Sequence, residues 1–186
     1  MANILNMIYA PLTDPTIILI LNYFTNFFTC FGAIFVLVVN MVILESTIIF
    51  PIKRQNRYIL LYGLLLLIGM IPFYVFKGVW IDEDLYAPRF NIYFLIYVIA
   101  FQASFVVIPI IYTSLKIYKS FETKALKKKW RYYFIGTLGA FSIPYLIWIS
   151  NFVFKAWFRL IVGVYAISVI LWGYLMYYGI GFKLKQ

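Results

Sequence analysis

Long apolar stretches separated by short polar segments dominate the pattern of residues along the chain. A helix needs about 20 apolar residues to cross the hydrocarbon core of a bilayer. Five stretches meet this requirement, near residues 16–44, 58–79, 91–115, 132–154 and 159–180. Asp14 followed by Pro15 is a typical helix start before the first of them. The pattern predicts an all-α, polytopic membrane helix bundle with about five transmembrane helices, forming a single transmembrane domain over residues 1–186.

Composition supports a bilayer as the surrounding solvent. Of the 186 residues, 65% are hydrophobic and 12% are charged, and the mean hydropathy is +0.94. Soluble domains are usually about 45 to 50% apolar and about 25% charged. A soluble fold could not bury this much apolar surface, so we expect an integral, multi-pass membrane protein.

Basic residues in the connecting segments predict the orientation, because Lys and Arg near span ends stay in the cytoplasm. Twelve of them fall on one side, at Lys53, Arg54, Arg57, Lys116, Lys119, Lys124, Lys127, Lys128, Lys129, Arg131, Lys183 and Lys185. The other side has four basic and four acidic residues, so its charges balance. Five spans then place the amino terminus outside and the carboxyl terminus in the cytoplasm.

The residues that most enzymes and metal sites need are scarce. Histidine is absent and Cys30 is the single cysteine, which argues against haem, zinc and copper sites and Ser-His triads. Neither a phosphate-binding loop nor a dinucleotide or HExxH motif occurs. We therefore predict a non-enzymatic protein with no catalytic residues, no cofactor and no metal.

Polar residues inside spans are costly and mark candidate functional positions. The possible intramembrane polar site consists of Asn22, Asn26, Asn40, Glu45, Gln102, Ser142 and Asn151. Such residues either line a pathway for a ligand or ion, or form hydrogen bonds between helices. Glu45 has two corresponding interpretations, a proton carrier or an ion pair with the basic segment that contains Lys53.

A basic segment with interleaved aromatic residues follows the third span. Nucleic-acid binding is one use of such a segment, but the inner membrane surface explains it better, because each basic residue there attracts anionic lipid. The candidate contacts for anionic lipid or a protein partner are Lys116, Lys119, Lys124, Lys127, Lys128, Lys129 and Arg131. We expect no nucleic-acid partner.

Glycines in the last two spans predict close helix approach, either within the chain or with a partner. Gly136 and Gly139 lie in the fourth span, and Gly163 and Gly173 lie in the fifth. Small residues allow the backbones of two helices to approach each other in lipid.

The carboxyl-terminal half also resembles a known group. The segments 115–118, 124–136, 149–152, 158–159 and 177–181 resemble multi-span membrane regions of archaeal proteins, which are similar to the seven-transmembrane input region of prokaryotic histidine kinases. The resemblance implies a sensor input and an archaeal plasma membrane; an organelle inner membrane is the alternative. The chain has five predicted spans instead of seven and no histidine for phosphotransfer, so signalling requires a separate partner. We expect the chain to bind a protein partner or to form a homo-oligomer.

Three functions remain open from the sequence. The first is a sensor-like or interaction module with a basic cytoplasmic face. The second is a small accessory subunit of a larger respiratory or transport complex in the membrane. The third is a small transporter or substrate-binding membrane component that uses the intramembrane polar residues.

Overall fold

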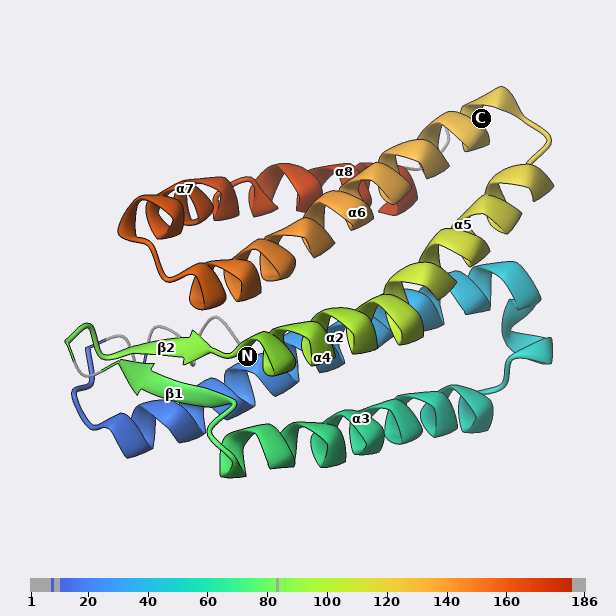
Figure 1. Cartoon of the computed structure of the whole chain (residues 1–186). Coiled ribbons are helices and arrows are strands. Elements are labelled where there is room, and N and C mark those ends of the chain that lie inside the picture. Colours follow the sequence, from blue (N-terminus) through green and yellow to red (C-terminus); the bar gives the residue numbers. More distant parts are fainter. Residues whose placement is uncertain (1–7, 9–10, 83, 182–186) are drawn as a thin grey trace. The chain divides into compact units, whose positions relative to one another are not determined.

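The computed structural model describes residue 8 and residues 11–82 and 84–181, and these residues form a mainly helical structure (Figure 1). Lys183 and Lys185, two of the predicted cytoplasmic charges, lie outside the described residues. The elements in chain order are α2 (Pro15–Ile49), α3 (Ile52–Val75), β1 (Val79–Asp82), β2 (Ala87–Phe90), α4 (Ile92–Gln102), η1 (Ala103–Val107), α5 (Ile108–Ser120), α6 (Lys124–Val153), α7 (Ala156–Ala166) and α8 (Val169–Gly181).

Helices long and apolar enough to cross a membrane account for most of the described chain. There are five of them among the described residues, covering Pro15–Glu45, Ile52–Val75, Ile92–Ser120, Lys124–Val153 and Ala156–Ile180. Each overlaps one predicted span. This agreement fits a multi-pass membrane protein.

Two helices begin several residues before the corresponding predicted spans. The second helix covers Ile52–Val75 instead of residues 58–79, and the fourth begins at Lys124 instead of residue 132. In both cases the helix starts among basic residues, which the apolar pattern excluded. Lys and Arg are good helix formers, so the helices extend beyond the apolar stretches at these ends.

A β-hairpin, which the apolar pattern did not reveal, connects the second and third spans. β1 and β2 pair antiparallel, with Val79 opposite Phe90 and Asp82 opposite Ala87. Asp82 also lies 3.3 Å from the Arg89 guanidinium, and this ion pair joins the two strands. The next helix begins directly after the hairpin, where the Asn91 side chain accepts a hydrogen bond of 2.8 Å from the amide of Phe94.

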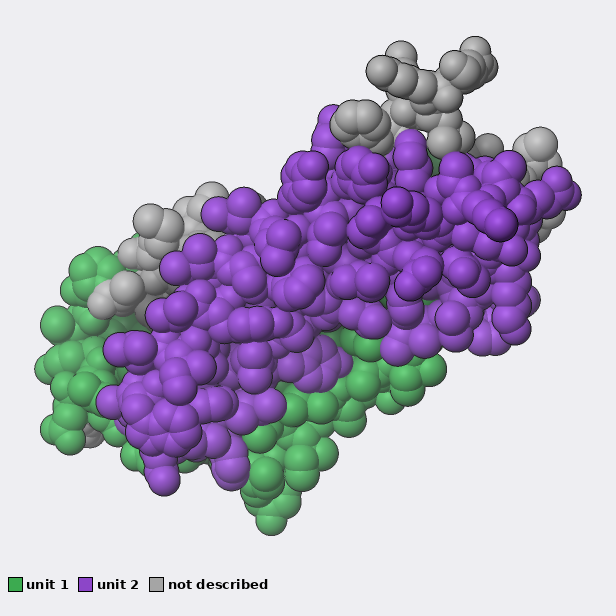
Figure 2. Space-filling model, turned by 90° about the horizontal axis from the view of Figure 1, so that it is seen from above, with its two compact units in different colours: residues 1–110 green, residues 111–186 purple. Residues whose placement is uncertain are grey.

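The described chain divides into two compact units, residues 1–110 and residues 111–186 (Figure 2). The boundary falls inside α5, between Ile110 and Ile111. By sequence, unit 1 contains five basic and five acidic residues, whereas unit 2 contains eleven basic residues and one acidic residue, Glu122. The whole formal charge of +10 therefore belongs to unit 2. A single domain over the entire chain stays a prediction.

In unit 1, a wide helical turn interrupts the third span. η1 is a π-helical turn, and its closing hydrogen bond runs from the amide of Ile108 to the carbonyl of Ala103, five residues earlier. Pro109 follows, and a proline ring crowds the carbonyl four residues before it, here that of Phe105. A π-helical turn is one of the adjustments that relieve such crowding in membrane helices.

In unit 2, α6 packs closely against α8 through glycines. A Cβ atom on Gly136 would lie 2.7 Å from the Trp172 carbonyl oxygen, and one on Gly179 would lie 2.6 Å from the Tyr133 amide nitrogen. Gly139 likewise faces the Trp172 ring. The predicted close approach at Gly136 and Gly139 is therefore present.

The two glycines predicted for the fifth span behave differently. Among the described residues, nothing lies within 4 Å of a Cβ atom placed on Gly163 or Gly173. Close packing at these two glycines is therefore absent from the described part of the chain, and packing against a partner stays a prediction.

Candidate functional site

Two of the predicted polar residues form a hydrogen-bonded cluster in unit 1. Asn22 and Asn26 lie one turn apart on α2, and the Asn26 amide donates to the Asn22 side-chain oxygen at 2.9 Å. The Tyr74 hydroxyl of α3 donates to the same Asn22 oxygen at 3.0 Å and accepts from Asn26 at 3.2 Å. Both asparagines are buried. Asn22, Asn26 and Tyr74 thus form hydrogen bonds between two helices, which is one of the two roles that the sequence analysis left open for the intramembrane polar residues.

A second cluster surrounds Gln102, which is fully buried at the end of α4, directly before η1. The Tyr62 hydroxyl of α3 lies 3.0 Å from the Cys30 carbonyl and 3.5 Å from the side-chain oxygen of Gln102. The Gln102 side-chain nitrogen has no hydrogen-bond partner among the described residues. Most buried polar groups in proteins are paired, so this nitrogen is an exception to the rule.

Asn40 and Glu45 lie further along α2. The Asn40 side chain is fully buried and its amide lies 3.5 Å from the Ile110 carbonyl, just after the π-helical turn. Glu45 lies 3.4 Å from the guanidinium of Arg54 at the start of α3, and both side chains are partly exposed. The predicted ion pair between Glu45 and the basic segment is therefore present, with Arg54 as the partner.

Ser142 and Asn151 belong to unit 2. The Ser142 hydroxyl donates to the Gly139 carbonyl at 2.6 Å and lies 2.7 Å from the Tyr165 hydroxyl of α7. Asn151 is buried near the end of α6.

The predicted intramembrane polar residues therefore do not form one compact site in unit 1. Asn22 and Asn40 are separated by 18 residues, or about 27 Å along a helix that rises 1.5 Å per residue. The structure instead shows separate groups at different depths of α2. Each asparagine in these groups forms at least one hydrogen bond.

Tyr62 and Tyr74 are partners that the sequence analysis missed. They lie on α3 in the same four-residue series as the buried residues Leu66 and Met70. A four-residue repeat places side chains on one helix face. The spacing was therefore the signal that could have identified these tyrosines as inward-facing.

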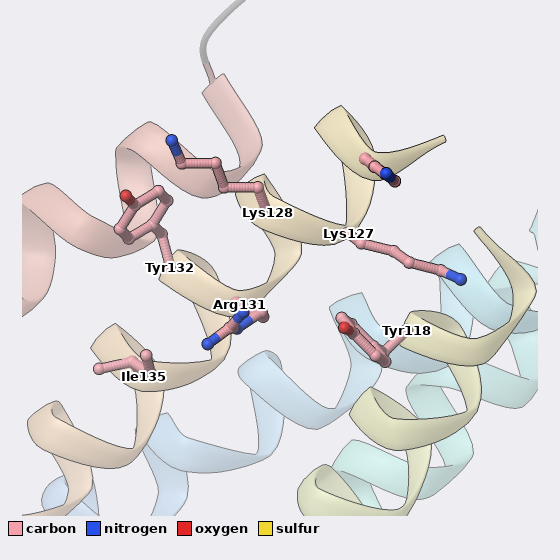
Figure 3. Close-up of a pocket in the computed structure, with 7 residues that line it drawn as sticks. Tyr118, Lys127, Lys128, Arg131, Tyr132 and Ile135 are labelled. Carbon is pink, nitrogen blue, oxygen red and sulfur yellow. The ribbon is translucent and has the colours of Figure 1, made fainter. Parts of the chain in front are cut away.

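Four of the predicted basic residues line one groove of about 400 Å³ in unit 2 (Figure 3). They are Lys124, Lys127, Lys128 and Arg131. Positions i, i+3, i+4 and i+7 share one face of a helix, which explains why the first two turns of α6 present all four together. The other groove residues are Tyr118 from α5 and Tyr132 and Ile135 from α6.

The remaining predicted basic residues lie elsewhere. Lys116, Lys119 and Lys129 are not among the residues that line the groove. The Lys116 ammonium lies 5.2 Å from the centre of the Tyr112 ring, which is a cation–π distance. The basic segment is thus divided into a groove set and a set outside the groove.

Buried aromatic contacts hold the helix that carries the groove. The Trp130 indole nitrogen donates to the Ser114 carbonyl at 2.9 Å and so links α6 to α5. The Trp130 ring also contacts Tyr133, with 4.7 Å between ring centres. Both side chains are buried, and their contacts hold in place the part of α6 that carries the groove residues.

No group of three or more His, Cys, Asp and Glu side chains that could hold a metal occurs among the described residues. Cys30 is free and buried. The candidate chemistry of the described residues is therefore hydrogen bonding in unit 1 and binding of negative charge in unit 2.

The described residues contain five helices long and apolar enough to cross a membrane, and the chain has a charge-neutral unit 1 and a basic unit 2. Comparisons with protein-family models, curated proteins and solved structures give no match.

Proposed function

We propose that this chain is a non-enzymatic, multi-pass membrane protein that acts as a sensor-like interaction module. Its basic face docks an acidic surface of a partner protein in the cytoplasm. The observation that supports the proposal is the uneven charge: unit 1 is neutral, whereas unit 2 has eleven basic residues and a single acid.

The basic residues are also concentrated in one short segment. Seven of the eleven in unit 2 lie between Lys116 and Arg131, at the end of α5 and the start of α6. Complementary potentials accelerate association and select partners. A compact basic surface at the membrane therefore favours an acidic partner over an apolar one.

The third span offers a connection for a sensor-like role. It runs from the end of the β-hairpin to Ser120, just before the basic segment, and contains the π-helical turn. Such turns occur frequently at functional sites in helices. A displacement at the hairpin end of this helix would then change the geometry at the basic end.

Site-directed photo-crosslinking in native membranes tests the docking proposal. A photoreactive amino acid at Ser120, which is exposed next to the basic residues, is compared with one at Tyr93, which is 71% exposed at the opposite end of the same helix. We expect the photoreactive residue at Ser120 to crosslink to one protein, at an acidic peptide of that protein. The photoreactive residue at Tyr93 should not give this adduct. The variant Lys116→Gln/Lys119→Gln, which removes two positive charges, should reduce the yield of this adduct at least about fivefold. Adducts with lipid only, or an unchanged yield in the variant, would overturn the proposal.

The orientation has its own test. In a Cys30→Ala background, an impermeant thiol reagent added to intact cells should label Asp84→Cys, and it should label Lys128→Cys only after the membrane has been opened. Labelling of Lys128→Cys in intact cells would contradict the orientation with the amino terminus outside.

An accessory subunit is the second candidate, and the surface of the last span favours it. Leu160, Ile170 and Tyr177 are 68%, 73% and 66% exposed along α7 and α8. This surface would pack against another subunit instead of lipid. A complex that remains stoichiometric after mild detergent extraction and is unaffected by Lys116→Gln/Lys119→Gln would support this alternative over the basic docking face.

A further inference from the structure

We propose that the groove at the start of α6 binds the headgroup of an anionic membrane lipid that carries two phosphates. The inference rests on the membrane placement in the proposed function and uses only the four basic residues that line the groove. It begins with the charges in the groove. Lys124, Lys127, Lys128 and Arg131 line it, and no carboxylate among the described residues forms an ion pair with any of the four.

The residues around the groove provide no compensating negative charge either. Glu122 is the single acid in unit 2 and does not line the groove. Four positive side chains that share one face repel each other unless an anion lies between them. The groove is therefore chemically complementary to a ligand with more than one negative charge.

The dimensions of the groove indicate the size of this ligand. From Lys124 to Arg131 the helix rises about 10 Å, at 1.5 Å per residue. The volume of about 400 Å³ lies within the range of small-molecule sites. One phosphate would contact only part of this row, whereas two phosphates joined through a short polar linker would extend along it.

The length of α6 places the groove at headgroup depth. Its 30 residues span about 45 Å, whereas the hydrocarbon core is about 30 Å thick. The difference of about 15 Å corresponds to about ten residues, which are Lys124 to Tyr133 if the apolar remainder occupies the core. This segment contains all four basic residues of the groove.

The other groove residues fit the boundary between headgroups and acyl chains. Tyr118 and Tyr132 have a polar hydroxyl on an apolar ring, a combination that is enriched at membrane interfaces. Ile135 lies on α6 one turn beyond Arg131, where acyl chains begin. In Figure 3, Lys127 from α6 and Tyr118 from α5 lie near each other, with the ammonium 5.8 Å from the ring centre. The basic residues of the groove would thus face the lipid headgroup, and its apolar end at Ile135 would face the acyl chains.

The site is also preorganised. Trp130 lies between the groove residues in sequence but points away from them, and its hydrogen bond to Ser114 fixes α6 against α5. Tyr132 contacts Tyr178 of α8 edge to face, with 5.4 Å between ring centres. The lipid would therefore meet a groove whose backbone is already in place, which lowers the ordering cost of binding.

Lipid titrations of the purified full chain, followed by native mass spectrometry, test the proposal. The probes are cardiolipin with two phosphates, phosphatidylglycerol with one, zwitterionic phosphatidylcholine, and inorganic pyrophosphate as the soluble source of the same chemistry. We expect cardiolipin to bind at least about tenfold more tightly than phosphatidylglycerol, and phosphatidylcholine to bind weakest. Pyrophosphate that binds as tightly as cardiolipin would overturn the lipid as the source of the anion.

Two charge-matched variants separate a built site from general attraction. Lys127→Gln/Lys128→Gln/Arg131→Gln removes three charges inside the groove, and Lys116→Gln/Lys119→Gln/Lys129→Gln removes three nearby charges outside it. The first should weaken cardiolipin binding at least about tenfold, because all three of its residues line the groove, and the second less than about threefold, because none of its residues does. Equal losses in both variants would overturn the groove as the site.

Two further measurements keep the result interpretable. Arg131→Lys keeps the charge and should retain most of the cardiolipin affinity, because the positive charge at this position is what attracts the phosphates. The adduct from the photoreactive residue at Ser120 should persist in the groove variant. Loss of lipid binding with the adduct retained would show that the two proposals stand on separate residues, whereas a groove variant that binds cardiolipin normally overturns this inference alone.

Discussion

Replacing Gln102 by methionine should stabilise the protein. The Gln102 side-chain nitrogen is buried without a hydrogen-bond partner among the described residues, and its oxygen lies 3.5 Å from the Tyr62 hydroxyl, which is a long contact for this kind of bond. Leaving a buried donor unpaired costs about 1 to 3 kcal/mol. Methionine is similar in length, is flexible and has no donor, so it can fill the same space without this cost.

The expected gain is smaller than the full cost. Polar groups of unfolded helices in a membrane find other partners, and measured interhelical hydrogen bonds there average about 0.6 kcal/mol. Gln102→Met should therefore raise the free energy of unfolding by about 0.5 to 1 kcal/mol. Titration with sodium dodecyl sulfate in mixed micelles, followed by tryptophan fluorescence, measures this difference.

Tyr62→Phe provides the matched comparison. It removes the hydroxyl that lies 3.0 Å from the Cys30 carbonyl and should lower stability by about 1 kcal/mol. Since the contact between Tyr62 and Gln102 is weak, the cost of Tyr62→Phe should be the same within about 0.5 kcal/mol in the Gln102→Met background. If Gln102→Met instead destabilises the protein by 1 kcal/mol or more, the amide binds a water or solute, and the interpretation of Gln102 as part of a pathway gains support.

Three other substitutions test the packing and the polar groups. Gly136→Ala should lower stability by about 1 to 3 kcal/mol, because its Cβ atom would lie 2.7 Å from the backbone oxygen of Trp172. Gly173→Ala adds a methyl group where there is open space and should stabilise α8 by about 0.5 to 1 kcal/mol. Equal effects of the two substitutions in thermal unfolding would refute the close packing at Gly136. Tyr74→Phe removes the hydroxyl that joins the two asparagines of α2 and should cost about 0.5 to 1.5 kcal/mol in the same denaturant titration, so no measurable change would count against the cluster. Glu45→Gln breaks a partly exposed ion pair and should change stability by less than about 1 kcal/mol, and a loss above 2 kcal/mol would contradict this assignment.

The helices could be predicted from the sequence because their signal is continuous. Each span is a long, mostly apolar stretch, and the start of α2 follows from Asp14, whose carboxylate accepts a hydrogen bond of 2.8 Å from the Thr16 amide. The β-hairpin gave no comparable signal. Its strands have four residues each, and β2 contains Pro88, which normally argues against a strand.

The candidate sites were predictable as residue types but not as arrangements. The cost of polar groups in lipid singled out Asn22 and Gln102 equally, yet only the structure shows that the first is paired and that the second has an unpaired nitrogen. Similarly, the basic segment was evident from the sequence. Which of its residues line the groove and which do not depends on where α6 begins. Because the helix starts at Lys124, a face of four charges exists that an unstructured loop would not have.

The short connection between α6 and α7 has a consequence for biosynthesis. Phe154, in a left-handed backbone conformation, and Lys155 are the two residues between these helices. Of the five candidate spans, α6 is the least apolar, and it is therefore the one least suited to enter a bilayer alone during translation. A connection this short lets α6 and the helix after it enter the bilayer as a pair, with Gly136 and Gly179 already in contact with the opposite helix. Gly136 and Gly179 would then act first in membrane insertion, before they contribute to the stability of the folded protein.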